Sequence, residues 1–213
     1  MKRFLFLSLC LMLHIASVMA QDFHEISVRY SPMMLSMEWQ GPMEGYGTKT
    51  ERYNGFAVGY KRGFELWEET NLYAVAGATI QWNSKKYDHI DIPDESGEGN
   101  QSIVIDDREN FLNVVIPLSI MYHFCITENV GLEPYAGIQG TWHAIAEDSY
   151  SNQYQDDYGK PNKFAFGCHA GLDITYNRFA IGGGYQMDFT KFDDNIVYYS
   201  KCSRWNIKLA FRF

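Results

Sequence analysis

From residue 24 onward, the chain alternates apolar with small or polar side chains over unusually long stretches. In the last stretch, one face of an extended strand carries Trp205, Ile207, Leu209, Phe211 and Phe213, and the other carries Asn206, Lys208, Ala210 and Arg212. A period of two is typical of a β-strand with two different faces. The sequence predicts an all-β protein with eight strands, at 24–37, 53–64, 72–82, 111–124, 131–145, 164–176, 179–190 and 203–213.

The length of these stretches and their aromatic content indicate a membrane protein. Several strands exceed the usual length of about 5–6 residues and reach the roughly 9–11 residues that cross a bilayer. The interior of an eight-stranded barrel is only just wide enough for side chains. It cannot hold most of the 14 Phe and 15 Tyr of the chain. We therefore expect the aromatic face to point outward into lipid; the alternative is a soluble barrel in which that face forms the core.

The connections between the stretches alternate between long and short, as in transmembrane barrels. Asn177 and Arg178 form the shortest, a two-residue hairpin turn. The sequence therefore predicts an eight-stranded antiparallel up-and-down transmembrane β-barrel. Two aromatic girdles are expected, with Trp82, Trp142 and Trp205 at the long-loop end and Phe64, Phe124, Tyr176, Phe179 and Phe213 at the other. At Pro32 we expect a β-bulge that reverses the faces and turns Leu35, Met37 and Trp39 outward.

Residues 1–20 have the pattern of a secretory signal peptide. Lys2 and Arg3 precede a short apolar segment, and Ala20 is the expected last residue before cleavage, which leaves residues 21–213 as the barrel domain. The formal net charge of −8 argues against nucleic acid as a partner. An exported chain of this kind belongs in the outer membrane and meets no pool of nucleotide cofactors, so no cofactor is expected.

Four segments resemble the small outer-membrane β-barrel family, which is OmpX-like and includes porin-family and PorT-like proteins. They are residues 112–122 (LNVVIPLSIMY), 134–140 (PYAGIQG), 170–176 (AGLDITY) and 208–213 (KLAFRF). The resemblance implies the same fold over the whole mature chain. It also implies that Phe211 and Phe213 act as a signal to the barrel-assembly machinery. It does not imply an activity, because similar barrels do different things.

If the apolar face meets lipid, charged residues point into the lumen. The expected luminal set is Arg29, Lys61, Glu65, Glu133, Asp173, Asp188, Lys208 and Arg212. Buried charges are costly unless they are paired. We therefore expect a structural network of ion pairs that plugs the barrel; the alternative is a lining that selects ions in a narrow channel.

Residues for catalysis or metal binding are sparse. His123, His143 and His169 are expected to point inward, but no luminal serine is evidently beside a histidine, and the best fragment of a catalytic triad is His143 with Asp148 and Ser149. Cys125, Cys168 and Cys202 remain after cleavage, without the spacing of a zinc site. No catalytic, cofactor-binding or metal-binding residue is assigned, and a lipid-modifying enzyme is the least favoured function.

Two of the expected long loops are candidates for binding. Loop 83–109 is acidic, with Asp91, Asp94, Glu95 and Glu98 as weak calcium candidates, and its Ser102–Ile105 segment is expected to extend the sheet above the membrane. Loop 146–163 carries Tyr150, Tyr154 and Tyr158. The expected function is that of a non-catalytic envelope protein. Its expected partners are outer-membrane lipid, lipopolysaccharide and an extracellular protein or glycan. The alternative is an accessory component of a secretion or assembly machine.

Overall fold

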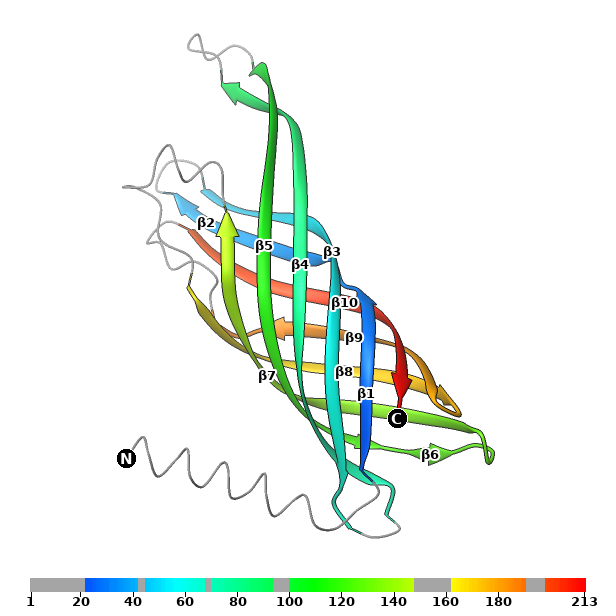
Figure 1. Cartoon of the computed structure of the whole chain (residues 1–213). Helices are drawn as coiled ribbons and strands as arrows, with labels where there is room; N and C mark the ends of the chain where they lie inside the picture. Colours follow the sequence, from blue (N-terminus) through cyan, green and yellow to red (C-terminus); the bar gives the residue numbers. More distant parts are fainter. Residues whose placement is uncertain (1–21, 42–44, 68–69, 94–99, 148–161, 191–197) are drawn as a thin grey trace.

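The computed structural model describes residues 22–41, 45–67, 70–93, 100–147, 162–190 and 198–213, and these ranges form a β-barrel (Figure 1). Its strands are β1 (Phe23–Tyr30), β2 (Met33–Gly41), β3 (Gly45–Glu65), β4 (Leu72–Pro93), β5 (Asn100–Tyr122), β6 (Phe124–Cys125), β7 (Val130–Glu147), β8 (Phe164–Tyr176), β9 (Phe179–Asp188) and β10 (Tyr198–Arg212). No helix long and apolar enough to cross a bilayer occurs within the described ranges.

The ten elements make eight barrel strands, as predicted. β1 and β2 are two halves of the first strand, and β6 continues β5 past His123. Every neighbouring pair is antiparallel, and the sheet closes where β10 pairs with β1 on one side and with β9 on the other. At the seam, the backbone groups of His24 and Phe213 exchange two hydrogen bonds, at 3.1 and 3.0 Å. Closure satisfies the backbone groups that an open sheet would leave at its edges.

The outer surface is apolar, as the period-two pattern predicted. Phe56, Ile181 and Leu209 are 68%, 57% and 56% exposed, whereas Ala57, Ala180 and Ala210 beside them are buried. The aromatic residues expected in the two girdles also lie on this surface, with Trp82, Trp142, Phe124, Tyr176, Phe179 and Phe213 among the exposed ones. A closed barrel with such a belt matches the hydrocarbon layer of a bilayer.

The predicted bulge at Pro32 is wrong. Tyr30 lies opposite Ile207 and Met33 opposite Arg204, so the register against β10 is the same on both sides of the proline. Only the ladder is interrupted, because proline has no N–H to donate. Leu35 therefore faces inward and is buried rather than meeting lipid. The side chains of Met37 and Trp39 lie outside the described part.

The expected loop at 83–109 is also wrong in its extent. β4 continues to Pro93 and β5 begins at Asn100, and the two strands pair along this whole length apart from a register shift between Tyr87 and His89. The predicted extension of the sheet at Ser102–Ile105 is confirmed, because Ile103 pairs with Ile90. A hairpin surrounded by water needs no apolar face, so its strands lack the alternating pattern. The polar composition of this segment therefore resembles that of a loop.

Candidate functional site

The centre of the lumen holds a compact cluster of charges on β1, β3, β8 and β10. The carboxylate of Glu25 accepts hydrogen bonds from Lys208 Nζ at 2.9 Å and Arg212 Nε at 2.9 Å, and Lys61 Nζ lies 3.2 Å away. Asp173 pairs with both lysines, with Lys61 Nζ at 3.3 Å from its Oδ2. Glu25 and Asp173 have no solvent exposure. Each lysine therefore bridges the same two carboxylates across the barrel.

A third carboxylate, that of Glu133, lies at the short-turn end of this cluster. Arg212 makes a two-pronged contact with Glu133, with its Nη1 at 2.6 Å from Glu133 Oε1. His123 Nδ1 lies 2.7 Å from the same oxygen. Paired contacts between guanidinium and carboxylate fix orientation as well as charge. Glu25, Asp173 and Glu133 thus balance Lys61, Lys208 and Arg212; these six form the central charge cluster.

Toward the long-hairpin end, the lumen is filled by a buried ion pair and an apolar group. Arg204 Nη1 donates to Asp188 Oδ2 at 2.9 Å, and Gln139 Nε2 donates to Asp188 Oδ1 at 3.2 Å. Beyond them, a set of buried side chains from four strands packs together; its members are Met33, Leu35, Tyr53, Phe111 and Cys202. This apolar group explains why Leu35 turns inward.

Most of the eight predicted luminal residues meet in these pairs. Lys61, Glu133, Asp173, Asp188, Lys208 and Arg212 are all paired. Glu65 stands apart: its Oε1 accepts a hydrogen bond from the backbone of Asn71 at 3.3 Å near the short-turn end. Arg29 also stands apart, because its one polar contact among the described residues is with Ser27 Oγ at 3.3 Å.

Two residues of the network were missed at the sequence level. Glu25 and Arg204 share the position parity of the inward residues Arg29 and Lys208 on their own strands. Alternate residues of a strand share a face, so Glu25 and Arg204 could have been predicted as luminal from the positions of Arg29 and Lys208.

Tyr135 on β7 is the largest side chain beside the central charge cluster. Its ring lies 5.8 Å from Lys61 Nζ and 5.9 Å from Lys208 Nζ. Gly171 and Gly184 make room for its hydroxyl group, since a Cβ atom there would approach the Tyr135 oxygen to 2.3 and 2.7 Å. These glycines let one bulky side chain cross the barrel.

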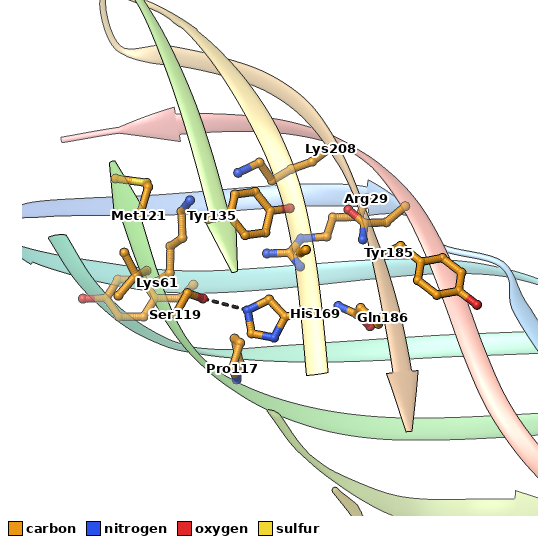
Figure 2. A pocket seen from close by; sticks show the side chains of 14 residues that line it. Arg29, Lys61, Pro117, Ser119, Met121, Tyr135, His169, Tyr185, Gln186 and Lys208 are labelled. Carbon is orange, nitrogen blue, oxygen red and sulfur yellow. Dashed lines mark hydrogen bonds between the residues drawn. The ribbon is translucent and has the colours of Figure 1, made fainter. Parts of the chain in front are cut away.

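A small cavity remains beside Tyr135 in the lumen, and residues of β1, β3, β4, β5, β8, β9 and β10 also line it (Figure 2). Its volume is about 40 Å³, which is room for roughly three water molecules at 10–15 Å³ each. Arg29, Lys61, Lys208, His169, Gln186 and Asn206 are among the residues that line it.

His123, His143 and His169 lie inside the barrel, as predicted, but the expectation that no luminal serine lies beside one of them is wrong. Ser119 Oγ is 2.7 Å from His169 Nε2, and Figure 2 marks this contact. His143 Nδ1 contacts Asn113 Oδ1 at 2.6 Å. Asp148 and Ser149 lie outside the described residues. The Ser119–His169 pair lacks the third group of a triad, because His169 Nδ1 has no hydrogen-bond partner among the described residues.

Cysteines and acidic residues offer no metal site within the described ranges. Cys125 is exposed, Cys168 half-buried and Cys202 buried, all unpaired and on strands. Of the calcium candidates, Asp94, Glu95 and Glu98 lie outside the described residues, as do Tyr150, Tyr154 and Tyr158. Asp91 is on β4, opposite Ser102.

Outside the lumen, the prominent feature is the upper part of the β4–β5 hairpin. The last pairs that join it to the barrel wall are Asn54 with Ser84 on one side and Asn110 with Glu147 on the other. The hairpin continues to Pro93 and Asn100, well past the other strands (Figure 1). At about 3.4 Å per residue, the stretch from Lys85 to Pro93 adds roughly 30 Å.

The fold is that of solved small outer-membrane barrels. The outer membrane protein OprG from Pseudomonas aeruginosa matches with a TM-score of 0.52 at 10% identity, over 91% of this chain and 96% of that one. Ail from Yersinia pestis gives 0.44 at 15% identity, over 91% and 100% of the two chains. Neisserial surface protein A gives 0.40 at 12%, over 88% and 97%. No protein-family model and no curated protein matches the sequence.

Proposed function

We propose that this chain is a non-catalytic outer-membrane β-barrel that acts at the cell surface through its β4–β5 hairpin, where it binds an extended segment of another protein. The observation that carries the proposal is the reach of the hairpin beyond the last pairs with β3 and β7. Above them, Tyr87–Pro93 and Asn100–Asp107 have a strand neighbour on one side only in the described part of the chain.

Such edges favour binding by strand addition. The outer N–H and C=O groups of each edge are positioned to pair with another extended chain. Residues 83–109 contain eight acidic and three basic residues. Their negative charge favours a partner segment that carries lysine or arginine, because complementary charge speeds and orients association. A protein of a secretion machine would be one such partner. A glycan is the other occupant, and photo-crosslinking distinguishes it from a protein.

The closed lumen supports a role without transport or chemistry. The central charge cluster, the Asp188–Arg204 pair and the apolar group around Met33 follow one another along the axis. The cavity beside Ser119 is too small for a lipid, so a hydrolase would have no place for its substrate.

Export and insertion complete the proposal. Residues 1–20 are cleaved after Ala20, and the aromatic C-terminus is read by the barrel-assembly machinery. The mature chain then contacts lipid through its apolar belt and lipopolysaccharide through the base of the hairpin. Mass spectrometry of the protein from the outer-membrane fraction tests this, with an N-terminus at Gln21 as the expected result.

Photo-crosslinking on intact cells tests the binding role. A photoreactive residue at Ile92 in the hairpin is compared with one at Glu128, which is exposed at the opposite end of the barrel. The proposal expects a protein adduct at Ile92 that is absent at Glu128. Ser102→Pro and Ile103→Pro are matched variants, because successive N–H groups point to opposite edges. One of the two should abolish the adduct. The folded barrel should still run as a compact band on an unheated gel and shift to a slower band after heating. Adducts with sugar or lipopolysaccharide alone would contradict a protein partner.

A further inference from the structure

Arg29 forms no ion pair with a carboxylate among the described residues. The three carboxylates of the central charge cluster balance its three cations, and Asp188 forms an ion pair with Arg204. Among the described residues, the half-buried Arg29 side chain has one hydrogen bond, with Ser27 Oγ. A cation held inside a barrel without a counter-charge is costly, since the interior has a low dielectric constant.

The strand register worsens this imbalance. Arg29 on β1 lies directly opposite Lys208 on β10, and both side chains point into the lumen. Like charges directly opposite each other destabilise a strand pair. Lys208 turns to Glu25 and Asp173, whereas Arg29 reaches toward the middle of the cavity (Figure 2).

The cavity in front of Arg29 has the character of a site for a small anion. Three cations line it (Arg29, Lys61 and Lys208), and no aspartate or glutamate does among the described residues. His169, which is 6% exposed, lines it too, and its buried Nδ1 has no hydrogen-bond partner within the described ranges. When His169 Nε2 accepts the Ser119 hydroxyl, the ring proton is on Nδ1, where an acceptor would satisfy it.

We propose that this luminal cavity binds one monovalent anion of chloride size on the Arg29 guanidinium. The volume of about 40 Å³ admits such an ion with one or two water molecules. The buried side-chain oxygens of Gln186 and Asn206 have no hydrogen-bond partner in the described part of the chain, and they accept hydrogen bonds from those waters. The anion gives the Arg29 guanidinium a local counter-charge and separates Arg29 from Lys208 electrostatically.

Bromide is the probe, because it replaces chloride and is located by its anomalous scattering. Crystals of the full-length mature barrel grown in sodium bromide are expected to show an anomalous peak at the Arg29 guanidinium. Arg29→Gln is expected to lose that peak, and Arg29→Lys to keep it. A lumen containing water alone in bromide, or a peak that persists in Arg29→Gln, would overturn the assignment.

Thermal stability in detergent gives a second readout that needs no crystals. The measured quantity is the temperature at which the compact band of the folded barrel is lost on a gel. This temperature should rise with the bromide concentration and then saturate. Sodium glutamate at equal ionic strength is the comparison, because glutamate is too large for the cavity. Arg178→Gln, which removes a positive charge from an exposed turn, is the matched control and should keep the bromide-dependent rise. Arg29→Gln should lose it. Equal rises in both variants would mean a general salt effect and would contradict the site.

Discussion

Lys208 Nζ donates a hydrogen bond to Glu25 Oε1 at 2.9 Å across a separation of 183 residues, at the seam where the last strand meets the first. The same carboxylate binds Arg212 and lies beside Lys61. One fully buried group therefore links β1, β3 and β10, and it is the natural first target for mutation.

Replacing Glu25 with glutamine should destabilise the barrel. The change leaves three cations facing the two remaining carboxylates of the central charge cluster, and breaking a buried ion pair costs about 3–5 kcal/mol. The measurement is urea-induced unfolding in detergent, followed by the compact band on unheated gels. Glu128→Gln, at an exposed turn, is the control and should leave the unfolding midpoint unchanged. Equal midpoints for both variants would mean that the network contributes no stability.

Gly184→Ala should destabilise the barrel through Tyr135. The new Cβ atom would lie 2.7 Å from the Tyr135 hydroxyl oxygen and 2.9 Å from the carbonyl oxygen of Ala170. Overpacking of this kind costs about 1–3 kcal/mol. Adding Tyr135→Phe removes the hydroxyl and should recover part of the loss, which a double-mutant cycle of unfolding free energies measures. At Gly140 a Cβ atom meets nothing within 4 Å, so Gly140→Ala should be neutral.

Phe213→Ala should lower the yield of inserted protein more than Phe189→Ala does. Both rings are on the outer surface, 58% and 60% exposed, so they lose similar contact with lipid. Phe213 alone is at the C-terminus, where it stacks on His24. The measurement is the amount of heat-modifiable protein in the outer-membrane fraction. Equal yields would contradict a role of the terminal aromatic residue in assembly.

The barrel should show no steady conductance in planar bilayers. The cavity beside Tyr135 holds only a few water molecules, and the Asp188–Arg204 pair obstructs the axis beyond it. A porin measured in parallel provides the positive control. Stable open steps from the purified barrel would refute the plugged lumen.

Ser119 should not react with a fluorophosphonate probe, although its hydroxyl lies 2.7 Å from His169 Nε2. No described carboxylate orients the histidine, and the cavity has no room for a substrate. Intact-protein mass spectrometry after probe treatment is the measurement, with Ser119→Ala as the control. A probe adduct that Ser119→Ala abolishes would revive the enzyme hypothesis.

The period-two pattern predicted the barrel, its strand number and the inward face of each strand in most places. It failed at Leu35, because the pattern does not distinguish an apolar residue facing lipid from one packed against Tyr53 and Phe111 inside. The pattern also could not predict which luminal cation pairs with which carboxylate. Which cation reaches Glu25 depends on the stagger between β1, β3 and β10, and alternation along a single strand carries no information about that stagger.

The position of Glu25 makes its charge balance complete only in the closed barrel. Its three cationic neighbours come from β3 and from β10. The pairing of β1 with β3 supplies Lys61, which lies opposite Glu25 in the strand register, and the pairing of β1 with β10 adds Lys208 and Arg212. An open sheet would therefore leave Glu25 with one cation, whereas the closed barrel gives it three. Joining β10 to β1 is favoured by charge as well as by backbone hydrogen bonds.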